Sequence, residues 1–225
     1  MRYNIFYGIH KALRAMLYET AIELQRTDFN NDDEAETILM NIMTVVDLFD
    51  KHAYVEDNLV FPSVEKYEPS VIDAFDQEHV KNHELYGKLR AFVAIFVPLK
   101  TNEEKIQLGS AIRKIFVEFV VFNLEHMAKE EDIINNLLWR YYTDADIRAI
   151  EHQIVSSQTP EATALAWKWM LRGLSNTEIT SWLKAVEKNA PEFVFNNLFA
   201  TAEKELSNIR FRQVLEGLTE GAMLA

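Results

Sequence analysis

Three segments of this chain set a histidine four residues from a second potential metal ligand. The stretch EHVKNHELYGKL at residues 78–89 contains His79 and His83, and HAYVE and HMAKE each pair a histidine with a glutamate. Residues four apart lie on one face of an α-helix. Together with a lone histidine near the N-terminus, the candidate ligands are His10, His52, Glu56, His79, His83, His126 and Glu130.

These side chains offer imidazole nitrogen and carboxylate oxygen, which suit divalent transition metals. Seven ligands are too many for one tetrahedral zinc ion, but they fit two six-coordinate ions bridged by carboxylates. A single histidine on an apolar helix face is more often a hydrogen-bonded core residue than a ligand. His152 has no ligand-spaced partner, and we expect it to be structural. Burying this many unpaired polar groups would cost on the order of several kcal/mol each, so the combination predicts a metal site.

Helical periodicity must position these ligands. Apolar residues at three- and four-residue steps predict a first helix over residues 3–26. A second helix passes through Pro62, where we expect a kink, and ends at the turn YEPS. A third helix extends to about Pro98. The capping box TNEE at residues 101–104 opens a fourth, which reaches about Tyr142.

A common centre requires the ligands to lie at one height. In antiparallel helices, residues at equal height are mirrored about the connecting turn. The midpoints between His10 and HAYVE, between HAYVE and HVKNH, and between HVKNH and HMAKE fall at residue 32 and at positions 67.5 and 104.5. All three lie in or beside predicted turns, as this symmetry requires. The sequence therefore predicts an all-α, up-down-up-down four-helix bundle over residues 1–142 with a dinuclear metal site.

Residues 143–225 predict a smaller helical extension. TPEA places Pro160 at a first helical position, SNTE is a capping box, and APEF opens a last helix to about Leu218. The tryptophans of the extension could pack on the bundle or on another subunit. Packing on another subunit would give a homodimer, although packing within the chain is commoner. These tryptophans are Trp167, Trp169 and Trp182.

Composition excludes several functions. The net charge of −12 and the lack of a basic stripe argue against nucleic acid and anionic membranes as partners. No glycine-rich phosphate loop precedes a helix, and the absence of cysteine excludes disulfides and thiolate metal sites. The longest apolar run, residues 92–99, is too short to span a bilayer, and no signal peptide is recognisable, so we expect a cytoplasmic protein.

The ordered pattern of a lone His, His-x3-Glu, His-x3-His and a His followed closely by an acid resembles the hemerythrin-like, HHE cation-binding family, over residues 1–142. The segment PEATALAWKWMLRGLSNTEITSWLKAVEKNAPEFVF is similar to the C-terminal part of longer bacterial members. The resemblance implies two iron ions with an oxo or hydroxo bridge, for which manganese or zinc could substitute. It implies one iron on His79, His83 and His126, the other on His10 and His52, and bridges from Glu56 and Glu130.

Two details depart from the family pattern. In the oxygen carriers of the family the last acid lies five residues after its histidine, and here both Glu130 and Glu131 are available. Helical phase favours Glu130, which shares the face of His126. Some members leave one imidazole of the third helix out. In that case we expect His83 to bind and His79 to lie beside the ligands or at the surface.

The resemblance favours a protein that binds dioxygen, peroxide or nitric oxide at the iron with the open position, as a carrier, store or redox sensor. The alternative is an enzyme that handles peroxide or nitric oxide, or a protein that repairs iron–sulfur centres. Repair-type relatives commonly carry a cysteine, which this chain lacks. A purely structural metal is a third reading, and a binding protein is favoured over an enzyme. Candidates for an apolar lining are Leu13, Phe49, Phe119 and Phe122.

Overall fold

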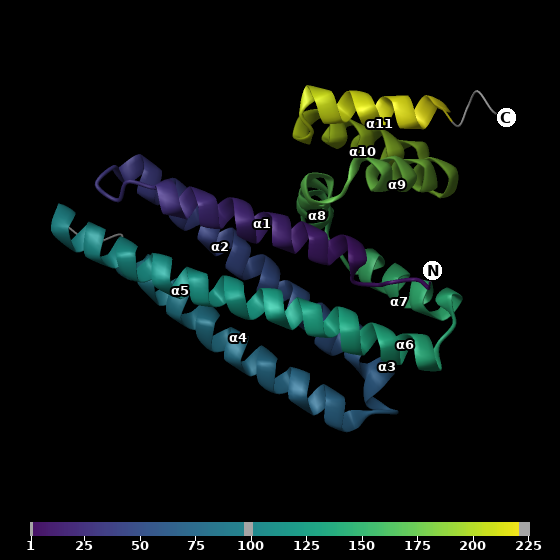
Figure 1. Cartoon of the computed structure of the whole chain (residues 1–225), viewed down its shortest axis with the longest axis horizontal. Helices are drawn as coiled ribbons and strands as arrows, with labels where there is room; N and C mark the ends of the chain where they lie inside the picture. Colours follow the sequence, from purple (N-terminus) through teal and green to yellow (C-terminus); the bar gives the residue numbers. More distant parts are fainter. Residues whose placement is uncertain (1, 97–100, 221–225) are drawn as a thin grey trace. The chain divides into compact units, whose positions relative to one another are not determined.

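The computed structural model describes residues 2–96 and 101–220, and every regular element in this part of the chain is a helix (Figure 1). The all-α prediction is therefore confirmed. Two compact units are present: one contains residues 2–6 and 16–157 apart from 97–100, and the other contains residues 7–15 and 158–220. In the described residues, no helix is long and apolar enough to cross a membrane.

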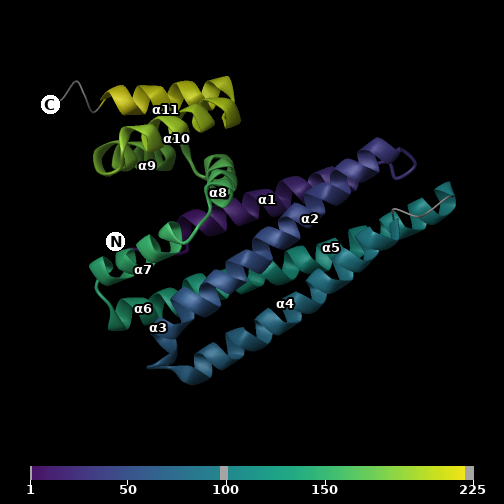
Figure 2. The same ribbon diagram turned by 180° about the vertical axis from the view of Figure 1, so that it is seen from behind.

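Four helical segments form the bundle of the first unit, with neighbours antiparallel (Figures 1 and 2). They are α1 (Tyr7–Arg26) from Met16 onward, α2 (Asp32–Val55), α4 (Pro69–Phe96) and α5 (Asn102–Lys129). The end of α1 is held to both neighbours. Asn41 of α2 donates a hydrogen bond to the Glu23 carboxylate at 3.0 Å, and Arg113 of α5 donates to the Thr27 carbonyl at 2.8 Å.

Local sequence explains where the bundle helices begin. The Asn31 side chain accepts hydrogen bonds from the backbone N–H groups of Asp33 and Glu34 at the start of α2. The predicted capping box at the start of α5 is confirmed, with Thr101 and Glu104 each bonded to the other's backbone. The predicted end of the third helix at Pro98 lies outside the described residues.

Two of the long helices contain a π-helical turn. The turn η1 (Glu56–Val60) joins α2 to α3 (Phe61–Glu65), and η2 (Glu130–Ile134) joins α5 to α6 (Asn135–Tyr141). A π turn contains about one residue more than an α turn, so the buried face advances by one position. Accordingly, Asn135 is fully buried although it lies five residues after the buried Glu130.

A π turn, η1, lies directly before Pro62, where a kink was expected. This proline lies in the first turn of α3, directly after η1, where its missing N–H does not interrupt the α-helical hydrogen bonds of α2. The fourth predicted helix likewise passes through η2 before it ends at Tyr141. The first helix begins at Tyr7, four residues later than expected.

The first unit continues past the expected boundary at residue 143. Helix α7 (Asp144–Ser156) packs Ile147 into a core at one end of the bundle, together with Phe6, Phe61 and Phe75. An ion pair of 2.6 Å between Arg2 and Asp144 joins this helix to the N-terminal segment. The chain changes unit between Ser157 and Gln158.

The second unit has its own apolar core. Its helices are α8 (Pro160–Gly173), α9 (Asn176–Asn189), α10 (Glu192–Glu205) and α11 (Asn208–Glu220). The fully buried core residues include Leu171, Ile179, Leu183, Leu198 and Val214.

The predicted features of the second unit fare differently. Pro160 and the Ser175–Glu178 capping box stand as predicted. The prediction of a single last helix was wrong, because the helix is interrupted between α10 and α11. There the Ser207 hydroxyl accepts a hydrogen bond from the Arg210 N–H. Trp167 and Trp182 pack edge to face at 6.3 Å within this unit.

The first turns of α1 belong to this second unit. Lys11 forms an ion pair of 2.6 Å with Glu178 at the start of α9. Gly173 lies so close that a Cβ there would be 2.4 Å from the Lys11 carbonyl oxygen. Glycine is therefore needed at the end of α8 because the two backbones touch.

Candidate metal centre

Four buried donors come together inside the bundle. One ligand atom each from Glu56, His79, His126 and Glu130 lies within 4.8 Å of all the others. Glu56 and Glu130 begin the two π turns, His79 comes from the middle of α4, and His126 comes from the last turn of α5. All four residues are at most 4% exposed.

A second group shares the two carboxylates. One donor atom from each of His52, Glu56 and Glu130 also lies within 4.8 Å of the others. Glu56 joins the two groups, since its Oε1 is 2.9 Å from His52 Nε2 and its Oε2 is 3.6 Å from His79 Nε2. One carboxylate therefore directs a different oxygen to each group.

Two further acids orient the imidazoles. His79 Nδ1 donates to Asp57 at 2.7 Å, and His126 Nδ1 donates to Glu78 at 2.8 Å. Because each Nδ1 carries its proton, each neutral ring presents its Nε2 lone pair to the cluster. These two Nε2 atoms are only 3.0 Å apart. Two lone pairs at this distance repel, so the space between them suits a shared proton or a cation.

The electrostatics favour positive charge at this point. Burial by itself lowers the pKa of His126, but Glu130, Glu56 and Glu78 outweigh it and raise the pKa to about 9. Burial likewise opposes the charged form of His79, whose pKa is nevertheless raised by the hydrogen bond to Asp57 and by Glu56. The site is therefore an anionic pocket that attracts a cation.

The donors also fit a metal ion in spacing. Imidazole nitrogens bound at about 2.1 Å in adjacent positions of a six-coordinate ion lie about 3.0 Å apart, close to the observed separation. Nitrogen and carboxylate donors without sulfur suit iron, manganese or zinc.

The structure does not bring His83 into the cluster. Its side chain is 56% exposed, and its Nδ1 is 3.4 Å from Asp50. The buried face of α4 runs through Phe75, His79, Asn82 and Tyr86, so the next inward position after His79 is residue 82. The order is thus the reverse of our expectation that His83 would be the ligand if only one of the pair bound.

The remaining candidates separate clearly. Glu130 is fully buried in the cluster, whereas Glu131 is only half-buried. His152 is exposed on α7 beside Ser156 and lies outside both donor groups. His10 is fully buried on the part of α1 that belongs to the second unit, so its role as a ligand remains a proposal.

Sequence reasoning missed the residues that support the ligands. Asp57 and Glu78 are two of 35 acids, and only their neighbours in sequence, Glu56 and His79, could have pointed to them. A buried network of Asn82, Asn123 and Tyr86 was also missed. In it the two amides exchange hydrogen bonds of 2.9 and 3.0 Å, and Asn82 donates to the Tyr86 hydroxyl.

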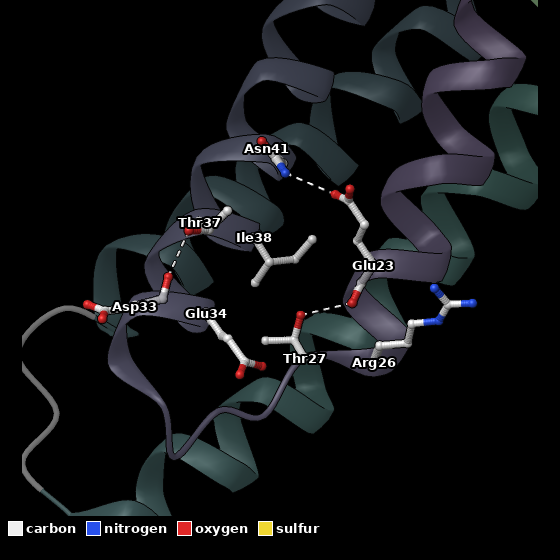
Figure 3. Close-up of a pocket in the computed structure, with 8 residues that line it drawn as sticks. All are labelled: Glu23, Arg26, Thr27, Asp33, Glu34, Thr37, Ile38 and Asn41. Carbon is white, nitrogen blue, oxygen red and sulfur yellow. Dashed lines mark hydrogen bonds between the residues drawn. The ribbon is translucent and has the colours of Figure 1, made fainter. Parts of the chain in front are cut away.

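An open hollow lies at the other end of α2 (Figure 3). Its lining includes Glu23, Thr27, Glu34 and Asn41. Of the hydrogen bonds drawn there, the one from Asn41 to Glu23 joins α2 to α1, and the other two lie within the end of α1 or within α2. Eighteen residues separate Glu34 from His52, which is about 27 Å along a helix. The hollow is therefore separate from the metal-ligand cluster.

The sequence of this chain is similar to that of several curated proteins. F-box/LRR-repeat protein 5 of Salmo salar is 19% identical over 172 residues, which are 76% of this chain and 24% of that protein. The Mus musculus protein of the same name is 17% identical over equal shares. The Xenopus tropicalis protein is 20% identical over 186 residues, 82% of this chain and 26% of that protein. The chain thus spans about a quarter of the length of these curated relatives.

The resemblance to longer bacterial members stays a prediction. The sequence profile of the hemerythrin HHE cation-binding domain matches residues 1–138, which include every candidate ligand. Because this match covers more than half of the chain, the protein belongs to the hemerythrin HHE cation-binding domain family.

Proposed function

We propose that the bundle holds two iron ions and binds dioxygen or a related small ligand, such as peroxide or nitric oxide, as a carrier, store or redox sensor. The observation that carries the proposal is Glu56, which directs one oxygen to each of two donor groups. A carboxylate so placed suits two cations better than one. Iron in such a centre would supply reversible redox chemistry.

The proposed ligands divide evenly between the two ions. His79 and His126 would hold one ion, His10 and His52 would hold the other, and the carboxylates of Glu56 and Glu130 would serve both. Support for His10 comes from its burial, its place in the family match and its mirrored position to HAYVE about the α1–α2 turn. His83 is left out because its side chain is exposed at the surface.

The remaining side chains hold the ligands and exclude water. Asp57 and Glu78 keep each Nδ1 protonated, so that the Nε2 atoms stay available to a metal. Phe49 and Phe119, at 5.3 Å edge to face, are both buried in the bundle core. An apolar surrounding favours binding of a small uncharged ligand over solvent entry. Phe122 instead stacks on the His126 ring at 6.0 Å.

The decisive experiment is metal analysis of the purified protein with its visible spectrum before reduction, after reduction and after return to air. Two irons per chain and charge-transfer bands that vanish and return would support the proposal. One zinc per chain, or a well-folded colourless protein without metal, would contradict it. Steady consumption of peroxide with a reductant would instead select the enzymatic alternative.

A variant tests the bridge directly. Replacing Glu56 by alanine removes an oxygen from both donor groups, so metal content is expected to fall to one ion or none. His152→Ala changes an exposed residue outside the groups and is expected to retain two ions. Full metal content in the Glu56→Ala protein would rule out the bridging role.

A further inference from the structure

Asn135 is a buried amide without a hydrogen-bond partner. Its side chain is fully buried, and neither its Nδ2 nor its Oδ1 bonds to any of the described residues. Leaving both ends of a buried amide unsatisfied is costly, and such groups commonly mark a functional site. Elsewhere the same bundle satisfies its buried amides, since Asn82 and Asn123 bond to each other.

The backbone directs Asn135 toward the metal centre. It is the first residue after η2, and its N–H donates to the carbonyl oxygen of Glu130 across the wide π turn. It therefore lies about one turn from Glu130 on the inward side of the helix. Helical side chains lean toward the N-terminal end of the helix, so the amide leans back toward the turn that contains Glu130.

The two π turns differ at this position. The residue that follows η1 is Phe61, which is buried and stacks on the His79 ring at 5.4 Å and 15°. The residue that follows η2 is Asn135. An apolar side chain therefore satisfies the fold at this position, and packing alone gives no reason for the amide.

We propose that Asn135 is a specificity-determining residue whose amide N–H donates a hydrogen bond to the small ligand bound at the centre. This inference rests on the proposed function. The amide selects ligands with an acceptor atom, and anionic ones above all, because hydrogen bonds to charged groups are the stronger ones. Its oxygen can also accept a hydrogen bond from a protonated ligand.

The test compares iron-loaded wild type with Asn135→Leu and Asn135→Ala, using azide as the anionic probe. Leucine keeps the branched shape and alanine is smaller, so at least one variant is expected to fold. Both are expected to retain the iron content of wild type, to bind azide at least about tenfold more weakly and to shift its infrared stretch. Asn136→Leu is the matched control, because Asn136 is exposed on the same helix.

Two results would overturn the proposal. If the azide affinity and the azide infrared stretch are unchanged in both variants, Asn135 is a core residue that hydrogen-bonds only to water. Loss of iron from both would make it a support for Glu130. A wild-type protein without two irons would contradict the proposed function itself, and this is read from the metal count before any azide is added.

Discussion

At the scale of single residues, identical side chains in one motif have different surroundings. His79 and His83 share the HVKNH motif, yet His79 is buried against Glu56 and His126, while His83 is exposed beside Asp50. A four-residue step rotates a helical residue by about 40°, which is enough to leave a narrow buried face. A three-residue step brings Asn82 inward instead.

This difference gives a first prediction. His79→Ala removes a donor from the cluster and is expected to lower the metal content per chain, whereas His83→Ala is expected to leave it unchanged. Metal analysis of the two proteins, purified alike, compares one substitution at neighbouring positions. Loss of metal from the His83 variant alone would support the expectation from sequence that His83, rather than His79, is the ligand.

The inward-pointing histidines and glutamates could be predicted from the sequence. Few residue types serve as metal ligands, and here these types recur at helical spacing. It did not identify Asp57, Glu78 or Asn135. Acids and amides are common on helices, and their partners come from other segments or, for Asn135, from none of the described residues. Only packing distinguishes them from surface residues.

At the scale of elements, the long helices followed from periodicity, but their π turns did not. Each turn begins at a cluster glutamate and shifts the buried face by one residue. A helix accommodates an extra residue as a π turn when the segments on both sides of the turn are held by their packing partners. Asn135 lies five residues after Glu130, where regular helical spacing would not place a buried residue, yet it is fully buried.

Deleting one residue tests this shift. Removing the exposed Asn58 from η1 is expected to convert the turn to regular α-helix and leave Phe61 and Val64 facing the core, so the protein still unfolds cooperatively. Removing the exposed Thr44 from the middle of α2 rotates every later residue of that helix by about 100° and is expected to abolish cooperative unfolding. Thermal denaturation followed by circular dichroism distinguishes the two, and equal damage would argue against the turn as an inserted residue.

The start of α9 predicts a pH dependence. Burial raises the pKa of Glu178, but hydrogen bonds from Lys11, Tyr7 and Ser175 outweigh it and lower the pKa to about 2, from an ordinary value of 4.5. A carboxyl whose pKa falls on folding stabilises the folded state above its unfolded pKa, and this contribution is lost as the pH falls toward about 2.

Glu178→Gln retains the capping side chain and removes the charge. The variant is expected to be less stable than wild type at neutral pH and equally stable near pH 2, as measured by denaturant unfolding. Glu161→Gln, at an exposed acid in the first turn of α8, provides the control. A difference that is the same at every pH would exclude the ionised carboxylate as its source.

At the scale of the whole molecule, the sequence predicted a bundle and an extension, but not that Tyr7–Ala15 belongs with residues 158–220. Such pairing depends on contacts between distant segments, which local patterns do not encode. Gly173 is its clearest mark, because a side chain there would collide with the Lys11 carbonyl.

One substitution at two glycines tests this contact. Gly173→Ala is expected to destabilise the protein by about 1–3 kcal/mol, because the added methyl group displaces the backbone of α1. Gly87→Ala, at an exposed helical position with open space around it, is expected to stabilise by about 0.5–1 kcal/mol. Opposite signs in thermal unfolding would confirm the close approach, and a neutral Gly173→Ala would deny it.

The dual membership of α1 has a consequence for synthesis. Tyr7–Ala15 is synthesised almost 200 residues before α11, which belongs to the same unit. At about 5–20 residues per second, this segment waits on the order of 10–40 s for its partners. During that interval the nascent chain exposes the apolar side of α1. We therefore expect a chaperone that binds amphipathic helices to bind this segment before α11 is synthesised.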